Sequence, residues 1–165
     1  MRKILIFGNS GSGKSTLAKK LCESNRMPHL DLDNLAWQPT LPPQRKPLDQ
    51  SGAEISRFIS ANSSWVIEGC YTDLLEFALE AANEVIYMNL SIELCIENAK
   101  SRPWEPHKYE SKEAQDKNFD MLISWISGYS TRKDTFSEAE HLRLFDGFDG
   151  IKTTITNNES THAFI

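Results

Sequence analysis

The sequence predicts an α/β fold in which a parallel β-sheet carries helices on both faces. Short apolar runs of strand character alternate along the chain with segments whose apolar residues recur at helical spacing. That alternation is typical of a parallel sheet with right-handed crossovers. The length of 165 residues suits a single domain with a sizeable core. Because such folds bind ligands at the carboxyl ends of their strands, the residues at those ends are the candidates for function.

The strands are predicted from runs of apolar and β-branched residues, and the helices from apolar residues three or four apart. Strands are expected at residues 3–7, 29–32, 65–69, 84–89 and 151–156. Helices are expected from the end of a glycine-rich loop to about Asn25, and over about 52–61, 75–82, 91–102 and 119–129. Ser91 is the expected N-cap of the helix over 91–102. A short helix is expected after Asn157. Four prolines make residues 34–50 a loop, and residues 103–116 are polar without an apolar period.

The glycine-rich loop is Gly8-Asn9-Ser10-Gly11-Ser12-Gly13-Lys14-Ser15, and it fits the phosphate-binding pattern G-x-x-x-x-G-K-[ST]. The glycines allow backbone N–H groups to converge on phosphate oxygens, and the helix N-terminus adds partial positive charge. We expect Lys14 to contact the β- and γ-phosphates and Ser15 to ligate Mg²⁺. The alternative is a chance Gly/Ser-rich turn, but a strand precedes the loop and an amphipathic helix follows it. ATP and Mg²⁺ are therefore the expected cofactors, bound by residues Gly8 to Thr16.

Acidic residues follow two further strands. Asp31 and Asp33 end the second strand, where a carboxylate can accept a proton from an attacking hydroxyl or hold Mg²⁺ through water. Either could instead cap a turn, and Asp33 is the stronger functional candidate. Glu68 ends the third strand, in the place of a second Mg²⁺-directed carboxylate. The adjacent Gly69 would let a ligand approach, and Tyr71 could line the acceptor pocket or begin the next helix.

Two arginines and two tryptophans are further candidates. Arg102 ends a helix before the polar segment, and Arg132 follows the long helix. Guanidinium groups suit the charge of a transferring phosphoryl group, although cations at helix ends also stabilise the helix dipole. Trp37 and Trp104 could stack on a ligand or anchor their loops. The lysines of the polar segment and its surroundings are expected to be solvated: Lys108, Lys112 and Lys117.

Composition limits the remaining possibilities. The formal net charge is −5, which argues against a protein that coats nucleic acid. No apolar run has the length of a membrane span and no signal peptide is expected, so a cytoplasmic location is predicted. Three widely spaced cysteines form neither a disulfide framework nor a zinc site. Cys22 and Cys95 are interpreted as packing residues, and the role of Cys70, close to the expected site, stays open.

Beyond these features, the chain resembles the small P-loop kinases of the adenylate and shikimate kinase type, and more narrowly the bacterial "DNA topology modulation" group of kinase-like proteins. The phosphate loop, residues 29–37 and residues 65–71 carry the resemblance, through Asp33, Trp37, Glu68, Gly69 and Tyr71. It implies a five-stranded parallel sheet of order 2-3-1-4-5 in a three-layer α/β/α sandwich, an acceptor-binding insertion at about 34–62 and a lid at about 103–116. The aromatic-Pro-Arg signature of nucleoside-monophosphate kinases and their lid arginines are absent from the corresponding segments.

Two hypotheses follow. The first is a single-domain kinase that transfers the γ-phosphoryl group of ATP to a small-molecule hydroxyl or phosphate acceptor, as a monomer or homodimer. In it Lys14, Asp33, Arg102 and Arg132 are catalytic, Ser15 and Glu68 direct the metal, and Asp31, Trp37, Gly69 and Tyr71 contact the acceptor. The second is a nucleotide-binding regulator or slow ATPase without an acceptor. A membrane partner is not expected, and an action on nucleic acid is disfavoured by the acidic pI of about 5.4.

Overall fold

A computed structural model provides the structure and describes residues 1–164. A five-stranded parallel sheet forms its centre, in the order β2–β5–β1–β6–β7. The strands are β1 (Lys3–Gly8), β2 (His29–Asp31), β5 (Trp65–Gly69), β6 (Glu84–Met88) and β7 (Ile151–Ile155). Numbered in chain order, these strands read 2-3-1-4-5, as expected. The α/β fold class is therefore confirmed.

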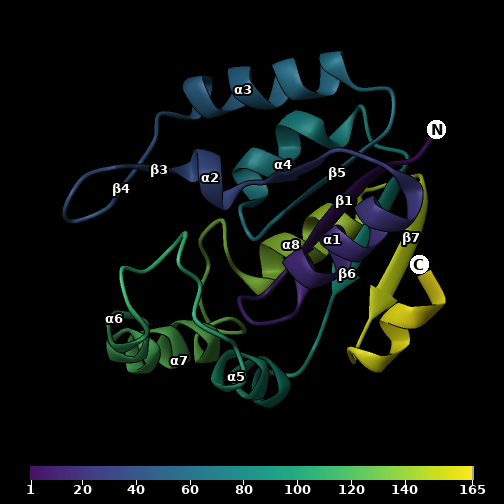
Figure 1. The fold of residues 1–165 in the computed structure, drawn as a ribbon. Coiled ribbons are helices and arrows are strands. Elements are labelled where there is room, and N and C mark those ends of the chain that lie inside the picture. The colour runs from purple at the N-terminus through teal and green to yellow at the C-terminus, as the bar shows by residue number, and fades with distance from the viewer. Residues whose placement is uncertain (165) are drawn as a thin grey trace.

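Helices cover both faces of this sheet (Figure 1). One face packs against α3 (Leu48–Ala61), α4 (Thr72–Leu79) and α8 (Glu138–Asp146), and the other against α1 (Lys14–Asn25), α5 (Ile92–Lys100) and α7 (Phe119–Ser127). Two shorter helices, α2 (Asp33–Ala36) and α6 (Lys112–Lys117), and a terminal 3₁₀ helix, Glu159–Phe164, complete the described chain. No helix among the described residues combines the length and apolar character needed to cross a bilayer.

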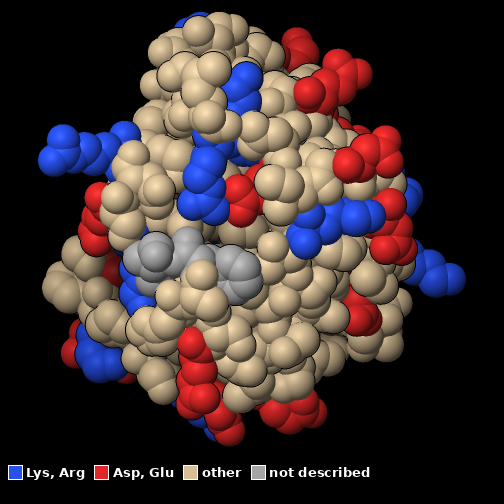
Figure 2. Space-filling model, turned by 90° about the vertical axis from the view of Figure 1, so that its right-hand side faces the viewer, with Lys and Arg blue, Asp and Glu red and all other residues tan. Residues whose placement is uncertain are grey.

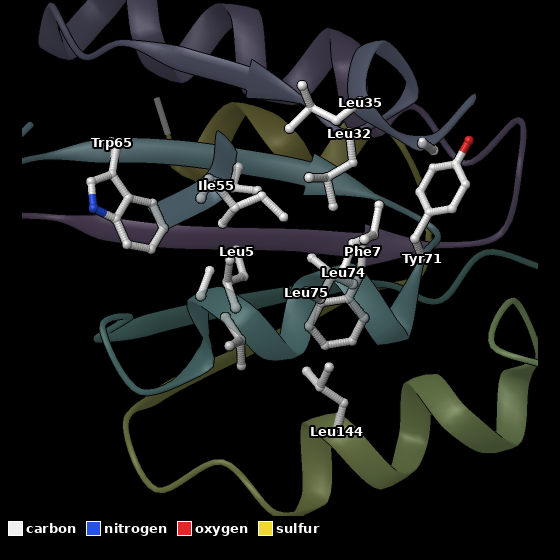
Figure 3. Close-up of a cluster of buried hydrophobic side chains, with 14 of the residues drawn as sticks. Leu5, Phe7, Leu32, Leu35, Ile55, Trp65, Tyr71, Leu74, Leu75 and Leu144 are labelled. Carbon is white, nitrogen blue, oxygen red and sulfur yellow. The ribbon is translucent and has the colours of Figure 1, made fainter. Parts of the chain in front are cut away.

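The central strands are apolar throughout because both of their faces are buried. In β1, Leu5 and Phe7 point to one face while Ile4 and Ile6 point to the other, and all four are fully buried. Figure 3 shows the buried cluster on the side of α3, α4 and α8, in which Leu5 and Phe7 lie near side chains of these helices. Burying one side chain of this kind contributes about 1.5–3 kcal/mol. The phosphate loop is thus held between a fixed strand and helix.

The segment predicted as a loop is more ordered than expected. Residues 34–50 contain most of α2, the two-residue strands β3 (Trp37–Gln38) and β4 (Gln44–Arg45), which form an antiparallel hairpin, and the first turn of α3. Pro47 is the N-cap of α3, a position where its missing N–H costs nothing. The prolines therefore limit this segment to short elements, and α3 begins at Leu48 rather than near Gly52. In Figure 1 the β3–β4 hairpin and α6 extend to the same side of the sheet.

Three helices of the described residues were not predicted: α2, α6 and α8. Helix α8 follows Ser137, whose hydroxyl accepts a hydrogen bond from the backbone N–H of Glu140. The apolar face of α8 is built from His141, Leu144 and Phe145. Because His141 occupies a position on this apolar face, the helical spacing of apolar residues is less evident in the sequence. The Ser137–Glu140 spacing does match a capping box. The polar residues 103–116 likewise contain the start of α6, which begins at Lys112.

Candidate functional site

A cavity of about 950 Å³ opens at the carboxyl ends of the strands. It is bounded by the phosphate loop, the end of β5, α2, the β3–β4 hairpin, the polar segment after α5, and α7. Its lining includes many of the predicted site residues: Ser10, Gly11, Lys14, Ser15, Asp33, Trp37, Glu68, Gly69, Tyr71 and Arg102. The fold therefore brings residues from distant parts of the sequence to one hollow, as the strand-end rule predicts.

The phosphate loop has the backbone conformation that its glycines permit. Gly11 has φ +77°, and a Cβ there would lie 2.4 Å from the Cys95 carbonyl oxygen, so another residue would be strained as well as crowded. Helix α1 begins at Lys14 directly after the loop, which places its N-terminus at the cavity. Lys14 Nζ donates to the Asn9 carbonyl oxygen at 2.9 Å. The lysine is thus folded over the loop, where phosphate would bind.

Ser15 and Glu68 meet at the floor of the cavity. Ser15 Oγ donates to Glu68 Oε1 at 2.7 Å, and Glu68 is 1% exposed. His29 Nε2 lies 3.4 Å from the same carboxylate oxygen. A hydroxyl and a carboxylate are the hard oxygen donors that Mg²⁺ takes in nucleotide sites, usually with several waters retained. The pair would suit the expected metal: Ser15 could ligate it directly, and Glu68 could accept from its waters.

Asp33 has two hydrogen-bond donors at the cavity wall. The Tyr71 hydroxyl donates to Oδ1 at 2.6 Å, and Lys108 Nζ donates to Oδ2 at 3.2 Å. Burial alone would raise the pKa of Asp33, but Lys108 and the Tyr71 hydrogen bond outweigh it and hold the pKa below its usual value. The carboxylate is therefore ionised at neutral pH. Burial raises the pKa of Tyr71, so the phenol keeps its proton and acts as a donor.

Asp31 has a different environment from Asp33. Its Oδ1 accepts the backbone N–H of Asp33 at 2.9 Å, which is the turn-capping role that the sequence left open. Asp31 pairs in register with Glu68 and is absent from the cavity lining. Burial, then the charges of Glu68 and Asp33, raise the pKa of Asp31 to about 6. Contact with an acceptor stays a prediction for this residue.

Replacing Asp31 by Asn is expected to stabilise the protein at pH 7.5. The folded-state pKa lies above the unfolded one, so ionisation of Asp31 as pH rises from about 4 to about 6 costs stability. The amide removes that cost and keeps the oxygen that accepts the Asp33 N–H. We expect the melting temperature to rise by about 2–4 °C, the effect of roughly 1 kcal/mol in a domain of this size. Thermal scans should show the gain at pH 7.5 and none at pH 4; a gain of equal size at both pH values would contradict this assignment.

The predicted aromatic and basic residues divide into two groups. Trp37 lines the cavity, 41% exposed, and its Nε1 donates to the Tyr71 hydroxyl at 2.8 Å. Arg102 also lines it, and its Nη1 lies 3.5 Å from Glu105 Oε2. Arg132 instead stacks on the outer side of the site, with its guanidinium carbon 3.6 Å from the centroid of the Trp125 ring. Trp104 is held by a hydrogen bond to its own segment. A catalytic role of Arg132 stays a prediction.

The cysteines behave as packing residues. Cys95 is buried in the cluster that α1 and α5 form with the sheet, and Cys22 packs against the same cluster. Cys70 borders the cavity, but burial raises the pKa of its thiol to about 12. A neutral thiol is a poor nucleophile, and Cys70 packs against the cluster that contains Leu5 and Phe7.

Comparisons with known proteins show the family of the chain. A protein-family model described as an AAA domain matches residues 4–118, which is more than half of the chain. The chain belongs to this AAA-domain family. An uncharacterised protein of Bacillus subtilis (strain 168), YqaC, is 27% identical over 135 residues, covering 78% of this chain and 72% of that one.

A solved structure shares the fold of this AAA domain. A gluconokinase from Sinorhizobium meliloti 1021 superimposes with a TM-score of 0.54 at 17% identity, covering 98% of this chain and 86% of that one. An uncharacterised protein from Eubacterium ventriosum ATCC 27560 gives a TM-score of 0.49 at 19% identity, covering 99% and 96%. The chain thus combines the phosphate-binding sequence pattern with an α/β fold that a solved gluconokinase structure shares.

Two features of this AAA domain were missed from the sequence. Lys108 was expected to be solvated, but it crosses the cavity to Asp33 and lies 3.9 Å from Glu105. Asp33 and Glu105 raise the pKa of Lys108 against the lowering effect of burial, so it carries a full charge. Arg45 was not considered, yet its guanidinium carbon lies 5.1–5.8 Å from the ring centroids of Trp37, Tyr71 and Phe136. The contacts of Lys108 with Asp33 and of Arg45 with Tyr71 and Phe136 join residues far apart in sequence, so no local pattern predicts them. Trp37 instead pairs with Arg45 across the β3–β4 hairpin.

A third missed feature is a buried polar chain behind the cavity. His141 Nε2 lies 2.9 Å from the Cys70 carbonyl oxygen, and His141 Nδ1 lies 2.6 Å from the Tyr129 hydroxyl. A carbonyl can only accept, so Nε2 carries the proton and Nδ1 accepts from Tyr129. The Tyr129 oxygen is then free to accept from the Tyr87 hydroxyl, 3.0 Å away. The chain ends on the turn between Glu68 and Tyr71 and thereby fixes the backbone of the site.

Proposed function

We propose that this chain is an ATP-dependent kinase that transfers the γ-phosphoryl group of ATP to a hydroxyl or phosphate group of a small-molecule acceptor. The observation that carries the proposal is the ionised Asp33 carboxylate, which faces the same cavity as Lys14 and Ser15 of the phosphate loop. An ATP-binding loop without an acceptor site would suit a nucleotide-binding regulator or a slow ATPase. A carboxylate, an aromatic wall and a cavity of about 950 Å³ beyond the loop provide room and a base for a second substrate. The narrower kinship with the "DNA topology modulation" group, and a cytoplasmic location, are part of the proposal.

The mechanism follows from what each side chain can do. The loop N–H groups and Lys14 hold the β- and γ-phosphates, and Ser15 with Glu68 would hold Mg²⁺, which supplies charge neutralisation when bound. An acceptor hydroxyl takes the place of Lys108 at Asp33 Oδ2 and donates its proton there. The acceptor oxygen forms the new bond to the γ-phosphorus while the bond from that phosphorus to the β–γ bridging oxygen breaks, and ADP leaves. Losing its neighbouring cation makes Asp33 a stronger base for this step.

The lid segment supplies positive charge to the same reaction. Arg102 and Lys108 are both held beside Glu105, whose carboxylate lies between them. Guanidinium and ammonium groups at this place can stabilise the equatorial oxygens of the transferring phosphoryl group. Closure of the segment would also exclude water and so suppress hydrolysis of ATP.

The proposal includes no nucleic-acid substrate. Figure 2 shows Lys and Arg side chains interspersed with Asp and Glu on one face of the molecule, without a continuous basic stripe. Binding to phosphate backbones needs clustered positive charge and weakens steeply with salt. Retention of the protein on a DNA column that is lost between 50 and 200 mM salt would oppose this part of the proposal.

A screen of ATP consumption tests the function. Nucleosides, nucleotides, sugars and small hydroxy acids are each added with Mg²⁺–ATP, and ADP release is measured. We expect at least one class to raise turnover above basal hydrolysis, and Lys14→Ala to lower the stimulated rate at least 100-fold because the lysine contacts both the γ-phosphate and the leaving group. Lys19→Ala, on the exposed side of the same helix, is the matched control. If no compound stimulates turnover, a regulator or slow ATPase becomes the better assignment.

A further inference from the structure

Two asparagines outside the sequence motif hold the phosphate loop by its carbonyl groups. Asn98, on α5, donates from Nδ2 to the Gly11 carbonyl oxygen at 2.8 Å. Asn158, after β7, donates from Nδ2 to the Ser12 carbonyl oxygen at 3.0 Å. The second N–H of Asn98 reaches Asn158 Oδ1 at 2.8 Å, so the two amides form one unit, the asparagine pair. Both loop partners are acceptors, which fixes the orientation of each amide.

This pair determines where two loop N–H groups point. A trans peptide is planar, so its C=O and the following N–H point in opposite directions. Holding the Gly11 carbonyl outward turns the Ser12 N–H inward, and holding the Ser12 carbonyl outward does the same for the Gly13 N–H. The Ser12 N–H donates to the Asn9 carbonyl oxygen at 3.3 Å, the same oxygen that accepts from Lys14 Nζ, and a phosphate oxygen would take the place of this acceptor.

The loop needs such a restraint because of its own composition. The two peptide groups whose carbonyls the asparagines bind, Gly11–Ser12 and Ser12–Gly13, lie between Gly11, with φ +77°, and Gly13, with φ +90°. Glycine rotates more freely than any other residue, so an unrestrained peptide beside it can turn its N–H away from the ligand. A Cβ on Gly13 would lie 2.8 Å from Asn158 Nδ2, which shows how closely the asparagine is fitted to the loop.

We propose that Asn98 and Asn158 are positioning residues that hold the Ser12 and Gly13 N–H groups ready for the phosphates of the nucleotide. Restraint before binding lowers the ordering cost that the nucleotide would otherwise meet. The inference rests on nucleotide binding by the loop and is independent of any acceptor. If ATP affinity depends on the asparagine pair but the protein phosphorylates no acceptor, the proposed function is wrong and this inference still holds.

Affinity measurements on single variants test the proposal. Asn98→Ala and Asn158→Ala are titrated by calorimetry with ATP and with inorganic tripolyphosphate, and their melting temperatures are recorded. We expect Kd for both ligands to rise about tenfold in each variant, the size seen when a hydrogen bond that orients a ligand-binding group is removed. The double variant should lose less than the product of the two effects because the residues share a bond.

The control is Asn157→Ala, which neighbours Asn158 and whose Oδ1 accepts from the N–H and hydroxyl of Ser160 within its own turn. It should lower the melting temperature about as much as Asn158→Ala while leaving both Kd values within twofold. Amide spectra should show the Ser12 and Gly13 signals broadened in Asn98→Ala and Asn158→Ala alone. Unchanged Kd values in either folded variant would overturn the proposal, and so would loss of the folded state in both, because that would make the pair a structural element only.

Discussion

Replacing Asp33 by Asn is expected to lower the rate of phosphoryl transfer by about 10²–10⁴-fold, the range that a general base contributes. The amide has nearly the shape of the carboxylate, and its oxygen can still accept from the Tyr71 hydroxyl as Asp33 Oδ1 does. It cannot accept the proton of an acceptor hydroxyl, and its NH₂ group would face Lys108 Nζ, which now approaches Oδ2. The loss should therefore fall on kcat.

ATP binding should remain intact in this variant. Asp33 is close enough to Lys14 for that cation to lower the Asp33 pKa, so the carboxylate also repels the bound triphosphate. Removing its charge should leave Kd for ATP equal to or slightly below that of the parent protein. Calorimetry with ATP and steady-state assays with the acceptor found in the screen separate the two effects. Asp49→Asn, on the exposed start of α3, is the control, and a kcat for Asp33→Asn within a factor of three of the parent would remove Asp33 as the base.

The sequence predicted the part of the candidate site around the phosphate loop because that part depends on local sequence patterns. A motif of fixed spacing between an apolar strand and a helix defines Gly8 to Ser15, and Glu68 lies near the end of the buried strand β5. Asp33 was expected to end the second strand, but β2 ends at Asp31 and Asp33 begins α2. The sheet places these ends together by topology alone. The contact of Ser15 with Glu68, at 2.7 Å, is the direct result.

The rest of the site depends on contacts that no local pattern encodes. Lys108 lies in a polar segment, and its pairing with Asp33 across 75 positions requires the folded lid. Asn98 and Asn158 are ordinary polar residues until α5 and the segment after β7 meet at the loop. His141 resembles a surface residue of a polar helix, although a capping box precedes it. These residues gain their roles from the tertiary structure, so their burial and partners, rather than spacing, identify them.

Replacing His141 by Phe is expected to lower the free energy of unfolding by about 2–4 kcal/mol at pH 7.5. Phenylalanine can fill the space beside Phe7 and Tyr87, whose rings already lie 5.7 and 6.3 Å from the His141 ring centroid. It leaves the Tyr129 hydroxyl and the Cys70 carbonyl without their partner, and each unsatisfied buried group costs about 1–3 kcal/mol. Denaturation with urea at pH 7.5 measures the loss.

The pH dependence of this loss identifies its cause. Burial, aided by the charge of Lys14, lowers the pKa of His141 to about 4 despite the hydrogen bond to Cys70. The unfolded chain takes up a proton near pH 6.5 while the folded one does not, so the stability that neutral His141 provides is complete above about pH 6.5 and declines toward pH 4. The difference between the parent protein and His141→Phe should therefore shrink as pH falls from 7.5 to 5. Asp31, whose raised pKa acts with the opposite sign in the same range, cancels from this difference because both proteins contain it.

The same replacement should also affect the candidate site. Without His141, the Cys70 carbonyl is free to turn, and with it the backbone that joins Glu68 to Tyr71. Tyr71 holds Asp33, so the folded variant should show a reduced kcat with an ATP Kd close to that of the parent protein. His162→Phe, at an exposed position of the terminal 3₁₀ helix, is the control for adding a phenylalanine in place of a histidine. If the parent protein and His141→Phe lose stability in parallel between pH 7.5 and 5, the acid sensitivity belongs to another group, and the buried chain from Tyr87 to Cys70 supports the fold without acting as its titrating element.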